Sequence, residues 1–139
     1  MISLPRAQQL LEAGLRWTPR PGDRFAVRVL EDQVFTISDM VVEPHEYPTG
    51  TVLGFNGTTE WALDSVAQED ALWLPREDQL RELLGGTFRS LARSTDGRYG
   101  VLIEHSGRPE RLFTAETAAD AYAQALLALV AAAVDHVEA

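Results

Sequence analysis

The sequence predicts an α+β fold in which an antiparallel sheet carries a long C-terminal helix on one face. Three observations lead to this prediction. An Ala- and Leu-rich apolar stretch covers residues 117–137 without Gly or Pro. Three short β-type segments precede it, separated by the turn sequences at 95–97 and 106–109. Another helical segment begins at Pro75, so the order from there on is helix, three strands, helix.

The C-terminal helix is the best-defined element. Ala and Leu are strong helix formers, and Thr117 can cap its start with Asp120 three residues on. Helical spacing places one apolar set on one face, namely Tyr122, Leu126, Leu129, Ala133 and Val137, widened by Leu127, Val130 and Val134. The opposite face carries Asp120, Gln124, Ala128, Ala131, Asp135 and Glu138. That face is either a solvated Ala-rich stripe or a second contact, with a neighbouring chain or under a loop.

The remaining elements follow from shorter patterns. The strands before the last helix are expected at Thr87–Arg93, Arg98–His105 and Arg111–Phe113, and a short helix at Pro75–Leu84. That helix should turn Leu80, Leu83 and Leu84 inward. A helix over Ser3–Ala13, capped by Ser3, should bury an apolar face of Leu4, Ala7, Leu10 and Leu11.

Residues 17–74 are harder to interpret. Phe25–Leu30 alternates like a half-buried strand, and Val34–Ile37 is expected to be the returning strand of a hairpin. Met40–Val42 is a candidate third strand. Residues 43–50 look like an irregular loop, and Thr51–Phe55 like a strand. Residues 58–66 look like a short helix that includes Val66. Residues 25–55 either extend the C-terminal sheet or form a separate one. We expect residues 1–139 to form a single domain with halves 1–74 and 75–139.

Composition excludes several functions. The chain has no Cys, and all 12 of its basic residues are Arg. Disulfides, thiolate zinc sites, a P-loop and Schiff-base catalysis are therefore ruled out. The net charge is −9, and residues 29–75 carry nine acids and no Arg. Such a surface repels phosphate, so no nucleic acid partner is expected, although helix–three strands–helix is also the order of double-stranded-RNA-binding domains.

The densest unusual segment is 54–66, where a strand, an Asn-Gly turn and a helix start bring polar groups together. The candidate binding residues are an acidic set with an aromatic rim, namely Asp39, Asn56, Glu60, Trp61 and Asp64. The structural alternative is a capped helix with Trp61 in the core. Acids of this region could hold a hard cation, but their spacing follows no known ligand motif. His45, His105 and His136 lie far apart, so no metal site and no cofactor are predicted.

These patterns favour a non-enzymatic, cytoplasmic protein-interaction domain that uses an acidic surface. Its partner is an unknown protein or, as a homodimer, a second copy. No catalytic residue set converges in the sequence. The alternative is a small metal-dependent enzyme that uses Asp39, His45, Glu60 or Asp64. The longest uninterrupted apolar run, Ala125–Val134, is half the roughly 20 residues of a membrane span. The N-terminus also lacks the apolar core of a signal peptide.

At GFNGTTEWALDS (54–65) and LWLPREDQLRELLGGTFRSL (72–91), the chain resembles a family of small uncharacterised actinobacterial proteins. The resemblance covers most of the chain. Some members are labelled pilus assembly proteins; the absence of Lys excludes the nucleotide-binding loop of a pilus-assembly ATPase. The resemblance implies no residue roles.

Overall fold

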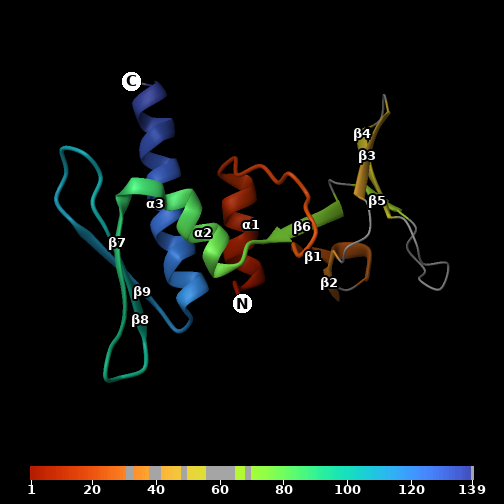
Figure 1. Cartoon of the computed structure of the whole chain (residues 1–139). Helices are drawn as coiled ribbons and strands as arrows, with labels where there is room; N and C mark the ends of the chain where they lie inside the picture. Colours follow the sequence, from red (N-terminus) through yellow and green to blue (C-terminus); the bar gives the residue numbers. More distant parts are fainter. Residues whose placement is uncertain (31–32, 38–41, 48–49, 56–64, 68–69, 139) are drawn as a thin grey trace. The chain divides into compact units, whose positions relative to one another are not determined.

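The computed structural model describes residues 1–30, 33–37, 42–47, 50–55, 65–67 and 70–138 (Figure 1). It confirms the α+β class: three α-helices accompany three small antiparallel sheets among these residues. The chain divides into two compact units. Unit 1 comprises Met1–Arg16 and Pro75–Ala139, and unit 2 comprises Trp17–Leu74. Each is described by itself below, and a single domain over 1–139 stays a prediction.

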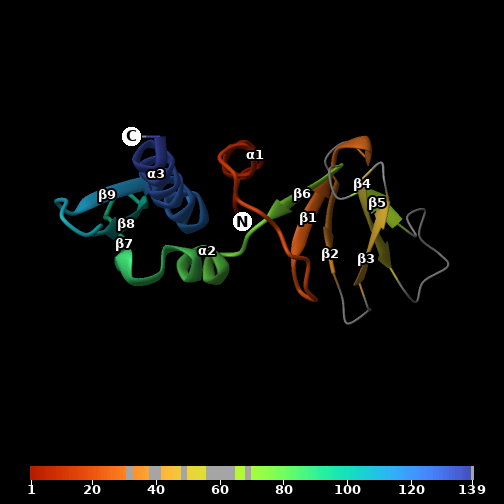
Figure 2. The ribbon, with the colours of Figure 1, turned by 90° about the horizontal axis from the view of Figure 1, so that it is seen from above.

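Unit 1 contains the predicted meander. Its elements are α1 (Leu4–Glu12), α2 (Glu77–Leu84), β7 (Phe88–Arg93), β8 (Tyr99–Ile103), β9 (Arg111–Ala115) and α3 (Ala118–Glu138). The strands lie in the order β7-β8-β9, and both pairs are antiparallel. Figure 2 shows α3 with this sheet on one side and α1 on the other. The long helix is therefore packed on one sheet face, as the sequence predicts.

Side-chain caps define the helix starts. The Thr117 hydroxyl accepts the N–H of Asp120 at 3.2 Å, and the Ser3 hydroxyl accepts the N–H of Arg6 at 3.4 Å. Both predicted caps are confirmed. Asp120 was assigned to the face of the helix opposite the apolar one, where either solvent or a second contact was expected. Its Oδ1 accepts the backbone N–H of Ser3 at 2.8 Å, which joins the start of α3 to the start of α1.

The core of unit 1 lies where the sheet, α1 and α2 meet the first half of α3. Val101 and Ile103 are buried on β8, and the Phe88 ring lies 5.8 Å from that of Tyr122. The helices add buried apolar residues: Ala7 and Leu10 from α1, Leu80 and Leu84 from α2, and Tyr122 and Leu126 from α3. Leu11 and Leu83 are 47% and 43% exposed, contrary to prediction. Each lies beside the buried face of a short helix, where the described residues cover it only in part.

Unit 2 has two sheets of its own, which answers the question left open for residues 25–55. One comprises β2 (Gln33–Thr36), β1 (Arg24–Val27) and β6 (Ala71–Leu74), in that order. The other comprises β3 (Val42–Tyr47), β4 (Gly50–Phe55) and β5 (Ser65–Ala67).

Three sequence predictions in unit 2 were wrong. Residues 43–47 belong to strand β3 and not to a loop; Pro44 is tolerated because β3 is an edge strand. Val66 lies in β5 and not in a helix. The strand from Phe25 stops at Val27 and continues as the 3-10 turn η1 (Arg28–Leu30). Ala26 is buried along with Phe25 and Val27, so β1 is not half-buried either.

A buried carboxylate organises the aromatic core of the β2-β1-β6 sheet. Asp23 is 2% exposed, and its Oδ2 accepts the indole N–H of Trp17 at 2.9 Å and the backbone N–H of Arg20 at 3.0 Å. Trp17 then stacks on Trp73, with ring centroids 6.5 Å apart. The two hydrogen bonds compensate for burying the charge and fix the ring that the core packs around.

We predict that Asp23→Ala destabilises unit 2 by about 2–3 kcal/mol, because it leaves the buried N–H of Trp17 without its acceptor. All three Trp residues lie in unit 2, so urea unfolding followed by Trp fluorescence measures it directly. Asp70→Ala, which removes a less buried carboxylate from the same unit, is the control. Equal midpoints for the two variants would contradict a structural role for Asp23.

We also predict that Asp120→Ala destabilises unit 1 by about 1–2 kcal/mol, since the Ser3 N–H loses a charged acceptor at the helix start. The three described α-helices all lie in unit 1, so far-UV circular dichroism at a helical wavelength reports on it. Asp120→Asn keeps a hydrogen-bond acceptor and should lower the free energy of unfolding by less than Asp120→Ala. Gln124→Ala, one turn further along α3, should leave the midpoint within error.

Candidate interaction surface

The helix α3 is longer than the elements that cover it. At 1.5 Å per residue its 21 residues span about 31 Å, whereas α1 and α2, of nine and eight residues, span about 12–14 Å. Strands β7 to β9 have five or six residues and reach about 17–20 Å. Figure 1 shows the C-terminal end of α3 extending past them. The C-terminal part of α3 must therefore project beyond the other elements of unit 1.

Burial along α3 follows the same division. Ala119, Ala121, Tyr122, Ala123, Ala125 and Leu126 are all buried. From Leu127 to Val130 the residues are only partly buried, and Ala131 and Ala133 are exposed. Ala133 shares the face of Tyr122 and Leu126 and was predicted to be inward. The face continues, but the sheet and the two short helices do not reach it.

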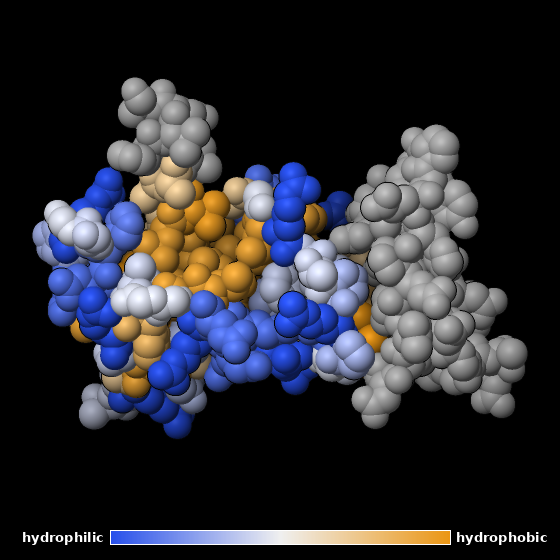
Figure 3. Space-filling view, turned by 45° about the horizontal axis from the view of Figure 1, so that its top comes forward, coloured by the Kyte–Doolittle hydropathy of each residue, from blue (hydrophilic) through white to orange (hydrophobic). Residues whose placement is uncertain are grey.

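We call Leu127, Val130, Ala131 and Ala133 the α3 apolar surface. Figure 3 shows a continuous hydrophobic area beside the C-terminal residues of α3. No ionisable side chain occurs between Tyr122 and Ala133. A helix that is apolar on all sides is ordinarily buried. An exposed apolar area of this kind on a folded unit is typical of a protein contact.

The prediction had assigned Leu127 and Val130 to the core and Ala131 to a stripe of uncertain role. The missed signal was the length of the helical pattern. A 21-residue helix cannot be covered along its whole length by strands of five or six residues. Comparing element lengths would have located the exposed end.

The predicted binding residues Asp39, Asn56, Glu60, Trp61 and Asp64 all lie outside the described residues. Their proximity stays a prediction. The three His residues fall in separate places: His45 in β3, His105 after β8 and His136 in α3. Within the described ranges, no three His, Asp or Glu side chains gather as metal ligands would.

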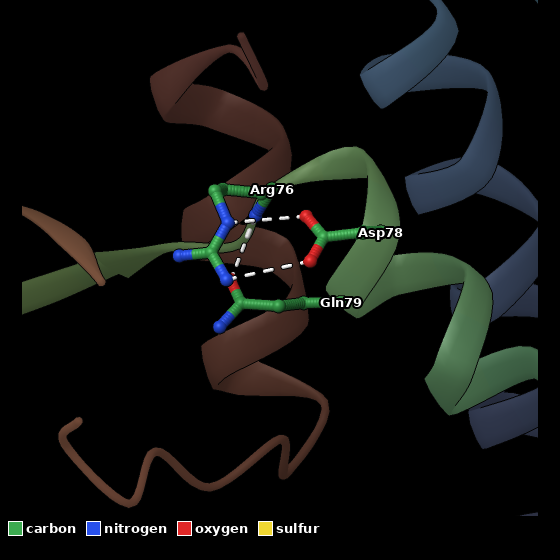
Figure 4. A network of polar contacts seen from close by, with 3 residues as sticks. All are labelled: Arg76, Asp78 and Gln79. Atoms are coloured by element: carbon green, nitrogen blue, oxygen red, sulfur yellow. Dashed lines mark hydrogen bonds and ion pairs between the residues drawn. The ribbon is translucent and has the colours of Figure 1, made fainter. Parts of the chain in front are cut away.

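Hydrogen bonds join Arg76, Asp78 and Gln79 at the start of α2 (Figure 4). The guanidinium of Arg76 donates to both oxygens of Asp78, at 3.1 and 3.4 Å. The backbone N–H of Arg76 donates to Oε1 of Gln79 at 2.9 Å. These bonds fix the first turn of α2, and the hydrogen bond from Arg76 lowers the pKa of Asp78 below its ordinary value of 3.8.

We predict that Arg76→Gln raises the pKa of Asp78 toward 3.8, because the charged donor is removed. A carboxyl with a lowered pKa stabilises the fold above its ordinary pKa, and this contribution is lost as pH falls through the lowered value. An NMR titration of the side-chain carboxyl carbons measures the change. Asp96, whose pKa is lowered chiefly by the Ser94 hydroxyl, should titrate as in the unmodified protein.

In the part of the chain that the structure describes, no helix is long and apolar enough to cross a membrane. Comparison with protein-family models, curated proteins and solved structures finds no match to this chain. The surface itself is therefore the basis for a functional proposal.

Proposed function

We propose that this chain is a non-enzymatic protein-interaction domain that pairs with a second copy of itself through the α3 apolar surface. The observation that supports the proposal is the continuation of the apolar face of α3 from buried Leu126 to exposed Ala133. Apolar area removed from water contributes about 25 cal/mol per Å². A contact at this surface would complete the burial that the sheet begins.

A second copy suits this surface for three reasons. The stretch from Tyr122 to Ala133 carries no charge, so two chains of net charge −9 can meet there without placing like charges in contact. Ala131 and Ala133 are small, which lets two helices approach closely. Antiparallel helices also oppose their macrodipoles, as a twofold axis requires when the helices lie across it.

Other functions have less support. The metal-dependent enzyme was predicted from Asp39, His45, Glu60 or Asp64. Of these four residues only His45, in β3, belongs to the described ranges. The acidic surface predicted from the same segment stays a prediction, as do a cytoplasmic location and the actinobacterial family. The concentration of negative charge in residues 29–75 disfavours nucleic acid.

We predict that Ala131→Glu weakens self-association at least tenfold, since it places a charge in the apolar contact one turn from Leu127. Sedimentation velocity over a range of protein concentrations measures the dissociation constant. Ala92→Glu is the matched control, because Ala92 is an equally small, exposed residue on β7.

A chain that stays monomeric at hundreds of micromolar would contradict the proposal. So would a dimer that Ala131→Glu and Ala92→Glu weaken equally. Circular dichroism of both variants checks that the helices remain folded, which is expected because both positions are exposed.

A further inference from the structure

Strand β7 lies at one edge of the sheet in unit 1. It pairs with β8 alone, and no other described strand lies along its second side (Figure 2). All of its residues after Phe88 are exposed. An exposed edge presents backbone N–H and C=O groups that a further strand can bind.

The hydrogen bonds between β7 and β8 show which backbone groups face outward. The N–H of Ser94 donates to the carbonyl of Arg98 at 2.9 Å, so Ser94 points toward the neighbouring strand. In an antiparallel pair successive residues point alternately toward the partner strand and away from it. The N–H and C=O groups of Leu91 and Arg93 therefore point away from β8, along the open edge.

The side chains of Leu91 and Arg93 share one face of the sheet, because side chains alternate along a strand. Leu91 is 39% exposed. The guanidinium of Arg93 lies 5.4 Å from the centre of the Tyr99 ring, and no described carboxylate forms an ion pair with it. A guanidinium stacked in this way keeps its in-plane N–H groups available for a carboxylate. The edge thus offers an apolar contact and a cation two residues apart.

The charge around β7 is positive, although the chain carries −9 overall. Residues 83–95 contain two Arg and no acid. Arg81 of α2 adds a third guanidinium, which lies 4.5 Å from the centre of the Phe88 ring at the start of the strand. Of the three, Arg89 is paired with Glu104, with 3.3 Å between its Nε and the carboxylate. Positive charge at an exposed edge favours an acidic partner.

The opposite edge of the sheet, β9, has a different charge. Glu110 precedes this strand and Glu116 follows it, and Arg111 is the one basic residue between them. An acidic segment lying along β9 would meet like charge at both ends. The two edges are therefore distinguishable by charge, and β7 is the edge that suits an acidic segment.

A second copy of β7 does not suit this edge. The antiparallel register that overlaps two β7 strands most fully pairs Leu91 with Leu91. It also places Arg93 opposite Arg89 of the second copy. Like charges directly opposite on neighbouring strands are destabilising, and charged residues on edge strands oppose self-pairing. The occupant of the edge is therefore a segment of another protein.

We propose that β7 binds an extended acidic segment of another protein, which adds a fourth strand to the sheet. The backbone of the segment bonds to the outward groups of Leu91 and Arg93. One of its apolar side chains packs on Leu91, and a carboxylate two residues away pairs with the Arg93 guanidinium. In this mode of recognition the main-chain hydrogen bonds give the affinity and the side chains give the specificity. The contact uses no residue of the α3 apolar surface.

A synthetic peptide of matching pattern provides the test. The probe is Thr-Glu-Thr-Val-Thr-Glu-Thr with an acetylated N-terminus and an amidated C-terminus, so that one face of the extended peptide carries Val between two Glu. Two control peptides have Gln or Arg in place of both Glu and keep the Thr and Val positions. Each is titrated into the full chain labelled with ¹⁵N, and NMR follows the backbone amide signals.

We expect the Glu peptide to bind saturably, with shifted amide signals and slower hydrogen exchange at Leu91 and Arg93. The Gln peptide should bind roughly threefold to tenfold more weakly, and the Arg peptide should not bind. Arg93→Gln should weaken binding of the Glu peptide by a similar factor at low salt and by less at 0.5 M NaCl. The matched control is Arg111→Gln on β9, which should leave the affinity unchanged, since Arg111 also lies over an aromatic ring, 4.8 Å from the centre of Phe113.

Leu91→Pro tests the backbone contacts separately. It removes an outward N–H and leaves the pairing with β8, because Pro is tolerated on edge strands where the N–H faces solvent. Binding of the Glu peptide should be lost, while the amide signals of β8 and β9 stay dispersed. If this variant does not fold, Arg93→Gln still decides, because it changes a single exposed side chain.

Several results would overturn the proposal. One is the absence of saturable binding of the Glu peptide at millimolar concentration, and another is equal binding of all three peptides. Amide shifts confined to β9 would place the contact at the wrong edge. Weaker self-association in Arg93→Gln would assign the edge to a second copy instead. Undiminished binding of the Glu peptide by Ala131→Glu would support the proposal, because the α3 apolar surface takes no part in it.

Discussion

Unit 1 depends on holding together two parts of the chain that are far apart in sequence. The Ser3 N–H and the Asp120 carboxylate meet at 2.8 Å across 117 positions. Closing a loop of this length costs on the order of 4 kcal/mol of chain entropy. One charge-assisted hydrogen bond contributes about 1.5–3 kcal/mol and does not offset that cost by itself. Burial of Ile2, Ala7 and Leu10 supplies the remainder, and the hydrogen bond fixes where α1 begins against α3.

That arrangement explains why α3 is covered unevenly. Its first half meets the sheet on one side and α1 on the other, so Ala119, Tyr122 and Leu126 are enclosed. Its second half passes beyond both. The same apolar sequence therefore builds a core at one end and leaves an apolar surface at the other. A small cavity lies at the transition, where β8 ends and β9 begins beside Ala128 and Ala132.

The features that sequence analysis predicted correctly are local ones. Thr117 and Ser3 predict where their helices begin, because a capping hydroxyl accepts a hydrogen bond from a backbone N–H in the first turn that follows it. The β7–β8 and β8–β9 turns are marked by Gly97 and Gly107, both of which have positive φ values that glycine adopts readily. The meander follows from these short-range signals, since consecutive antiparallel strands pair with their neighbours.

The features it missed depend on tertiary structure. Helical periodicity identifies the apolar face of α1 or α2, but it does not show that the described residues cover Leu11 and Leu83 only in part. Pro44 argues against a central strand, yet it is compatible with the edge position that β3 occupies. Spacing in the sequence also does not specify that Arg108 and Arg111 lie beside Ala132, because this requires the packing of a hairpin on a helix.

The insertion of Trp17–Leu74 within unit 1 has a consequence for the order of folding on the ribosome. Helix α1 leaves the exit tunnel before Trp17–Leu74, but its partner α3 is translated more than one hundred codons after it. Until α3 is made, Leu10 and Ile2 of the nascent chain lack the helix on which α1 packs. By contrast, every strand of Trp17–Leu74 has already been translated. We therefore expect unit 2 to be able to fold during synthesis before α1 packs on α3, although α1 is translated first of the three.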